Sequence, residues 1–154
     1  MAETLGTLCD KLTIVKLKQW HAEDPARRES LARQERQLQE EIDEFVNAAV
    51  AGTIPAHRLT FSANKIYKQE GNAVPDASGT FGQVVSQLAL VNCRLWHEQE
   101  RVYDFASVPV PEKDAVVKSL AHLNLQRTKC IDEIDRLFQA AIAQSGADAS
   151  SRQR

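Results

Sequence analysis

The stretch from Val84 to Tyr103, VVSQLALVNCRLWHEQERVY, decides the fold that the sequence predicts, because a similar stretch occurs earlier in the chain. Trp96 lies 76 positions after Trp20, and these are the only two tryptophans in the sequence. A histidine follows each tryptophan, and an acidic residue comes three positions after each histidine. The apolar residues that precede Trp96 also match those that precede Trp20 at the offset of 76 positions. We interpret the two stretches as equivalent helices of a duplicated helical hairpin.

Length and composition set the broad class of the protein. The chain has 154 residues, a hydrophobic content of 43% and a formal net charge of -2, which are ordinary for one soluble globular domain. This charge gives no reason to expect a nucleic acid partner, and we also expect no membrane span. The first residues have no secretory signal, and three widely spaced cysteines indicate reduced thiols. We therefore expect a cytoplasmic protein.

Helical periodicity predicts an all-α fold, a four-helix bundle of two helical hairpins with an internal pseudo-repeat. The expected organisation is one helical domain over residues 1–145, with hairpins at 4–51 and 81–145 and a disordered tail at 146–154. A loop over residues 52–80 crosses between the hairpins. Asp24-Pro25 and Thr80-Phe81-Gly82-Gln83 are typical helix starts, and Gly52 is a typical helix end.

Asn124 and Arg127 are the most informative polar residues. They interrupt an apolar seam at helical spacing, formed by Val117, Leu120, Asn124, Arg127, Ile131, Ile134 and Phe138. A buried guanidinium needs an acidic or amide partner, and the candidates are Asp10, Asp24, Glu98, Glu100 and Asp135. The pair forms either a polar network that fixes which helices face each other, or a binding site for a carboxylate, phosphate or sugar.

The repeated histidines and acids are candidate metal ligands. Residues three positions apart share a helix face, so packing of the two halves about a pseudo-two-fold axis would bring together His21, Asp24, His97 and Glu100. That set of ligands suits Zn, Mn or Fe(II). Histidines that cap the ends of helices beside packed indoles need no metal. We expect no cofactor and no metal. The sequence contains no catalytic motif from which a catalytic residue could be identified.

The loop at residues 52–80 contains further polar residues that could close over an anionic or sugar ligand. They are His57, Arg58, Asn64, Lys65, Tyr67 and Lys68. The alternative is a solvated loop held by one or two aromatic side chains.

The segments LALVNCRLWHEQE, from Leu88 to Glu100, and LNLQRTKCIDEID, from Leu123 to Asp135, resemble a bacterial all-α family of unknown function. Its pattern joins an Asn-x-x-Leu-Trp-His-x-Glu-Asp helix to a later Leu-Asn-x-x-Arg-Asn-x-x-Ile-Glu-x-Ile-Asp helix. In this chain Gln99 and Thr128 replace an acid and an asparagine of that pattern. The resemblance implies these signature positions: Asn92, Trp96, His97, Asn124, Arg127 and Asp135. Members are often encoded beside glycosyltransferases, which implies a glycan-related context.

The function that we expect is a non-catalytic accessory or binding protein in polysaccharide or glycan biosynthesis. Its partner would be a glycosyltransferase or a sugar-phosphate ligand, bound by the signature positions together with Lys65 and Tyr67. The alternatives are a metal-assisted enzyme that uses the histidines and carboxylates, or a structural homodimeric helical module.

Overall fold

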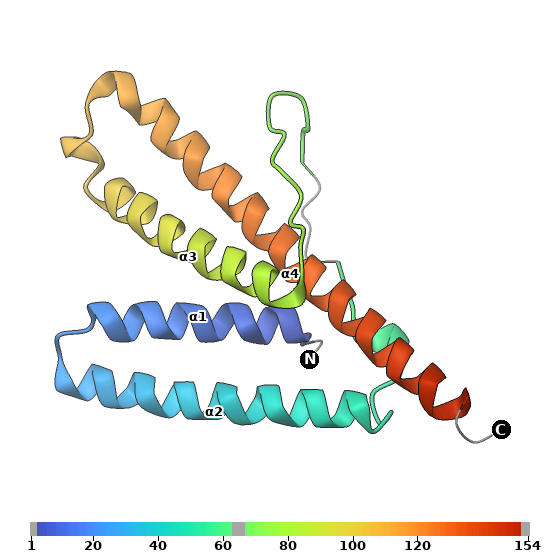
Figure 1. Ribbon diagram of the computed structural model, residues 1–154. Helices are drawn as coiled ribbons and strands as arrows, with labels where there is room; N and C mark the ends of the chain where they lie inside the picture. Colours follow the sequence, from blue (N-terminus) through green and yellow to red (C-terminus); the bar gives the residue numbers. More distant parts are fainter. Residues whose placement is uncertain (1–2, 63–66, 152–154) are drawn as a thin grey trace.

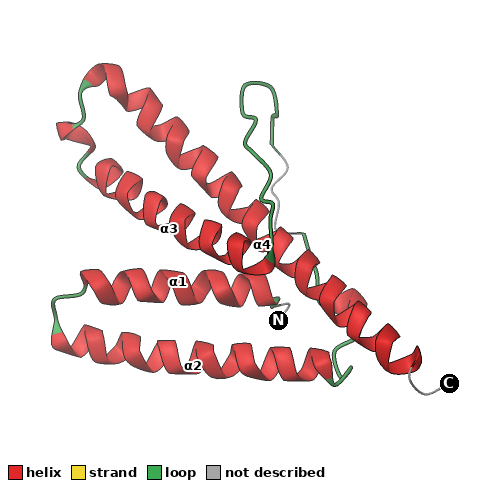
Figure 2. Ribbon diagram, in the orientation of Figure 1, coloured by secondary structure: helices red, strands yellow, loops and turns green. Residues whose placement is uncertain are grey.

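The computed structural model describes residues 3–62 and 67–151, with side chains as far as residue 146, and this part of the chain is helical without any strand (Figure 2). Four α-helices account for most of it: α1 (Leu5–His21), α2 (Pro25–Val50), α3 (Phe81–Tyr103) and α4 (Lys113–Ser151). Three short 3₁₀ helices lie in the connections: η1 (Ala56–Arg58), η2 (Phe105–Ser107) and η3 (Val110–Glu112). The predicted all-α class is confirmed.

Side-chain caps explain where the helices begin. The Asp24 carboxylate accepts a hydrogen bond of 2.9 Å from the Arg27 backbone N–H, and Pro25 is the first residue of α2. At α3 the Thr80 hydroxyl and the Gln83 side chain form the predicted capping box. Both predicted starts are therefore confirmed.

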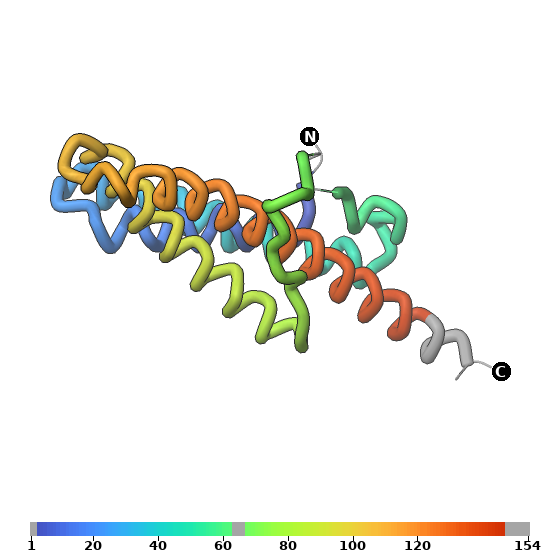
Figure 3. The backbone as a smooth tube through the Cα atoms, turned by 90° about the horizontal axis from the view of Figure 1, so that it is seen from above, coloured from blue at the N-terminus to red at the C-terminus, as the bar shows by residue number. Residues whose placement is uncertain are grey.

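The helices pair as two hairpins, α1 with α2 and α3 with α4 (Figure 1). Helix α1 also packs against both α3 and α4, so it joins the two hairpins. Both hairpin turns lie at the same end of the molecule, and the C-terminal part of α4 extends past the other helices at the opposite end (Figures 1 and 3). The rise of 1.5 Å per residue gives this helix, with its 39 residues, a length of roughly 58 Å.

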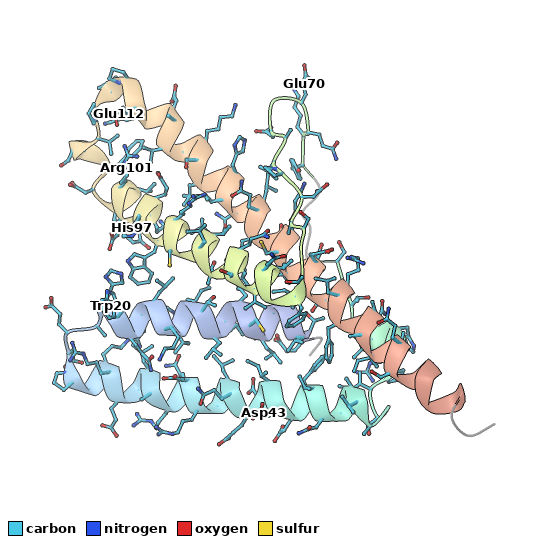
Figure 4. The ribbon with its side chains drawn as sticks, viewed as in Figure 1. Trp20, Asp43, Glu70, His97, Arg101 and Glu112 are labelled. Atoms are coloured by element: carbon cyan, nitrogen blue, oxygen red, sulfur yellow. The ribbon has the colours of Figure 1, made fainter. Side chains whose placement is uncertain are left out.

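The crossover between the hairpins is fastened to the helices by a few contacts. Gly52 follows the end of α2 with φ of 73°, a left-handed conformation that favours glycine, so the predicted helix end is confirmed. Leu59 is completely buried in the core. The Lys129 ammonium on α4 donates to the Val74 carbonyl at 2.9 Å and to the Asp76 carboxylate at 2.6 Å. These contacts hold parts of the crossover to the helices, whereas its tip around Glu70 projects away from them (Figure 4).

The buried face of α4 differs from the predicted seam near its beginning. Ile131, Ile134 and Phe138 are buried as expected, but Val117 is 53% exposed and Val116 is buried instead. The main core cluster consists of Leu5, Ala49, Leu59, Val84, Leu88, Cys130, Ile131, Ile134 and Phe138. The three cysteines, Cys9, Cys93 and Cys130, form no disulfide.

Helix α4 continues to Ser151, so residues 146–151 are helical where a disordered tail was predicted. A single glycine, Gly146, costs only about 1 kcal/mol inside a helix, and an existing helix extends more easily than a new one forms. The last predicted tail residues, 152–154, lie outside the described part of the chain. The internal repeat stays a prediction, since Trp20 is 84% exposed whereas Trp96 is partly buried. In the described residues, no helix combines the length and the apolarity needed to cross a bilayer.

Candidate functional site

Of the five acidic candidates, the partner of Arg127 is Asp10, a residue of α1 that is only 3% exposed. The guanidinium binds the carboxylate with both Nε and Nη2, and the Nε···Oδ1 distance is 2.7 Å. The Asn92 amide of α3 donates to Asp10 Oδ1 at 2.9 Å and to the Thr13 hydroxyl at 2.7 Å. We call Asp10, Thr13, Asn92 and Arg127 the Asp10 cluster; it joins α1, α3 and α4.

The geometry of the Asp10 cluster favours the structural interpretation. The hydrogen bonds of Asp10 raise the pKa of the Arg127 guanidinium, so this side chain stays charged and held. A two-pronged arginine–carboxylate pair also has strong directional preferences, which specify how the helices meet. The guanidinium already binds Asp10 through both Nε and Nη2. The cluster therefore connects the two hairpins.

Two other predicted binding residues lie apart from this cluster. The Asn124 amide donates to the Leu120 carbonyl of its own helix at 3.0 Å. Asp135 is fully buried and accepts a 2.7 Å hydrogen bond from the Gly6 backbone N–H at the start of α1. Burial raises the pKa of Asp135 to about 6, against the opposing effect of hydrogen bonding by Thr4 and Gly6. Asn124 and Asp135 therefore do not form one site with Arg127.

One contact joins the two tryptophan–histidine stretches. The His21 ring stacks on the Trp96 indole, with ring centres 4.7 Å apart. The Trp96 N–H donates to Glu100 Oε1 at 2.8 Å, while His97 Nδ1 lies 3.6 Å from Glu100 Oε2. Trp20 and His97 are labelled near this end of the molecule in Figure 4. Of the four candidate metal ligands, His21 is thus held by stacking, and Glu100 accepts a hydrogen bond from Trp96 with one of its oxygens.

The candidate metal ligands form no ready-made coordination set. Asp24 caps α2, and His21 packs on an indole. Among the side chains described, in residues 3–62 and 67–146, no three or more histidines, cysteines, aspartates or glutamates are grouped where they could hold a metal ion.

The polar loop residues are only partly covered by the structure. Asn64 and Lys65 lie outside the described residues. Tyr67 is half-buried, and His57, Arg58 and Lys68 are exposed. The described loop residues therefore show no closed binding site of their own.

A polar groove between α3 and α4 brings together residues that sequence reasoning mostly missed. Its volume is about 660 Å³, within the range of small-molecule sites. We call it the α3–α4 groove, and it is lined by Arg94, His97, Glu98, Ala115, Lys118, Ser119, His122, Leu123 and Gln126. Among these, the sequence predicted a binding role only for His97.

The charge of the groove is mostly positive. Arg94 and Lys118 are exposed, and within the described part of the chain neither has an ion-pair partner within 4.0 Å. Glu98 is the one lining carboxylate, and Arg101 Nη1 already lies 3.6 Å from its Oε2. Two permanent cations therefore line the groove against one carboxylate, and this excess of positive charge favours an anionic ligand.

The groove also contains polar atoms that lack hydrogen bonds. Glu98 Oε2 and His122 Nε2 are buried and have no hydrogen-bond partner among the described residues. Such atoms are uncommon in folded proteins, since losing water without gaining a partner costs roughly 1–3 kcal/mol. No hydrogen bond in the described structure links Ser119, His122 and Glu98, so a catalytic triad is not assembled.

A signal for the groove is present in the sequence. Arg94, His97 and Glu98 are spaced by three and four positions, and Lys118 and His122 are spaced by four. Each set therefore lies on one face of its helix. The two faces belong to one hairpin, so a search for matching polar stripes on consecutive helices could have found the site.

Together, the fold and the groove define an all-α protein with a positively charged pocket between the helices of its second hairpin. Comparisons of the chain with protein-family models, with curated proteins and with solved structures give no match.

Proposed function

We propose that the protein is a non-catalytic accessory protein that binds a small phosphate-bearing ligand in the α3–α4 groove. The observation that carries the proposal is the pair of unpaired cations, Arg94 and Lys118, beside two histidines in a groove of about 660 Å³. A single ion would occupy little of this volume, whereas a small organic phosphate fits within it.

The chemistry of the two cations suits this ligand. An arginine guanidinium matches the oxygens of a phosphate with a planar pair of donors, and a lysine ammonium adds a mobile point charge. His97 and His122 come from the two helices that form the walls and add ring N–H donors. Because the cations are exposed, each contributes modestly, and we expect affinities from about 0.1 to 1 mM.

Titration calorimetry with glucose 1-phosphate as the probe tests the proposal. Replacing both cations in Arg94→Ala/Lys118→Ala should weaken binding at least tenfold. The matched control is Arg27→Ala/Arg36→Ala, which removes the same charge from exposed positions on α2. Its affinity should stay within twofold of the wild-type value.

Two results would contradict the proposal. One is the absence of saturable binding to the wild-type protein, and the other is equal weakening in both double variants, which would indicate a general effect of net charge. Phosphorus NMR of the same mixture tests the non-catalytic part. The probe should be recovered unchanged, and release of inorganic phosphate would contradict that part alone.

The role in polysaccharide or glycan biosynthesis, with a glycosyltransferase as the partner, rests on the family resemblance and stays a prediction. A homodimer also stays a prediction. It is favoured by exposed apolar residues at the end where the hairpin turns lie, namely Trp20, Tyr103, Val110 and Val117. Sedimentation across a concentration series tests it, and a strictly monomeric protein would contradict it.

A further inference from the structure

The Glu98 carboxylate has a chemical requirement that a bare anion does not meet. Its side chain is only 21% exposed, and Oε2 accepts no hydrogen bond from the described residues. Arg101 Nη1, at 3.6 Å, lies too far away to donate one. This oxygen needs a donor, and an acceptor-only anion at the same point would instead be repelled by the carboxylate.

On the opposite wall of the groove, His122 also has a buried polar atom that needs a hydrogen-bond partner. His122 Nε2 is buried without a partner and belongs to α4, whereas Glu98 belongs to α3, and both line the α3–α4 groove. A hydroxyl group both donates and accepts hydrogen bonds. Ligand hydroxyls could therefore donate to Glu98 Oε2 and accept from the His122 ring, which would satisfy both orphaned atoms.

We propose that the groove selects a polyhydroxylated phosphate, with the sugar phosphates as the chemical class, and that Glu98 determines this selectivity. The inference rests on the proposed function: the phosphate binds to Arg94 and Lys118, and the hydroxyl groups of the same ligand bind to Glu98 and His122. Sites that hydrogen-bond a ligand hydroxyl discriminate strongly against analogues that lack it, since the buried polar groups are then left unpaired.

Calorimetric titration of one protein with two probes, glucose 1-phosphate and inorganic sulfate, tests the inference. Sulfate supplies charge and acceptors but no hydroxyl donor. The wild-type protein should bind glucose 1-phosphate at least tenfold more tightly than sulfate. In Glu98→Gln this preference should fall below threefold, because the amide replaces an acceptor by a donor and removes the repulsion of the anion.

Two further variants make the result specific. Glu112→Gln is the matched control, since Glu112 also binds Arg101, at 3.0 Å, but does not line the groove. It should keep the wild-type preference. His122→Phe retains a ring of similar shape without its nitrogens and should lower the preference in the same direction as Glu98→Gln. It also provides a second test if Glu98→Gln does not fold.

The outcomes separate the two proposals. Equal binding of both probes to the wild type, abolished by Arg94→Ala/Lys118→Ala, would overturn the selectivity and leave the proposed anion site intact. A wild-type preference that survives in both Glu98→Gln and His122→Phe would likewise overturn the assignment to these residues. Absence of binding by either probe would overturn the anion site itself.

Discussion

At the scale of single residues, Asp10 is the position on which the arrangement of the hairpins most depends. The apolar seam around Arg127 predicts that an acidic partner exists, and Asp10 is one of five candidates. Periodicity cannot choose among them, because it places a residue on a face of its own helix and does not say which helix faces it. The structure chooses Asp10 and adds Asn92 from a third helix.

Asp10→Ala should destabilise the protein by about 2–3 kcal/mol, since it leaves the Arg127 guanidinium, with a side chain only 32% exposed, without its carboxylate. Urea unfolding of Asp10→Ala, Arg127→Met and the double variant measures the coupling. Methionine keeps much of the apolar stem of arginine. We expect a coupling free energy above about 1 kcal/mol, whereas strictly additive losses would contradict a direct pair.

Asp135 makes a pH-dependent contribution to stability. Burial raises its pKa from 3.8 to about 6. A carboxyl whose pKa is higher in the folded state stabilises the fold most when protonated, so its contribution is lost as the pH rises through about 6. Asp135→Asn keeps an oxygen for the Gly6 N–H and cannot ionise. The stability of this variant relative to the wild type should rise by roughly 2 kcal/mol between pH 4.5 and pH 7.5.

Urea unfolding at both pH values measures the relative stability, and comparison of the two proteins at each pH cancels the titration of other groups. A difference that does not change with pH would contradict the raised pKa of Asp135.

At the scale of helices, the close approach of α1 to α4 depends on Gly6. A Cβ atom at this position would lie 2.4 Å from the Ile131 carbonyl oxygen, well inside van der Waals contact. In the sequence, Gly6 resembles only a weak point near the start of a helix. Only the structure, with the α4 backbone beside Gly6, shows that the missing side chain allows the two helices to approach.

Gly6→Ala should therefore destabilise the protein by about 2–3 kcal/mol, because α1 and α4 must separate to admit the methyl group. Gly82 in α3 is the matched control, with nothing within 4 Å of an added Cβ. Gly82→Ala should stabilise the protein by about 0.5–1 kcal/mol through helix propensity. Thermal unfolding of both variants measures the contrast, and a similar loss in both would show that the Gly6 contact with α4 is not responsible.

Helix starts and ends were predictable because they depend on neighbouring residues. The Thr80–Gln83 capping box and the Asp24-Pro25 start need only local hydrogen bonds and the fixed φ of proline. The buried face of α4 was harder to predict. Near its beginning the face turns toward Val116 and away from Val117, because the tertiary contacts and not the spacing decide which of two adjacent valines is covered.

At the scale of the whole molecule, two hairpins and their long crossover follow from the sequence, whereas polar stripes on consecutive helices only indicate where the α3–α4 groove lies. For Arg127 the sequence left open a polar network or a binding site, and the structure joins Asn92 and Arg127 to Asp10 in a network across three helices. His97 was expected in a site, and it lines the α3–α4 groove together with His122 and Lys118. The neighbours of His97 depend on the rotation of α4 against α3, which short-range patterns do not fix.

Binding of a phosphate-bearing ligand in the α3–α4 groove can be followed residue by residue in amide NMR spectra recorded during titration with glucose 1-phosphate. If the ligand binds in the groove, saturable shifts should concentrate at residues 94–98 of α3 and 118–126 of α4. Amides around Asp24 at the α1–α2 turn should stay unchanged. Shifts that fail to saturate, or that centre on the α1–α2 hairpin, would contradict the account.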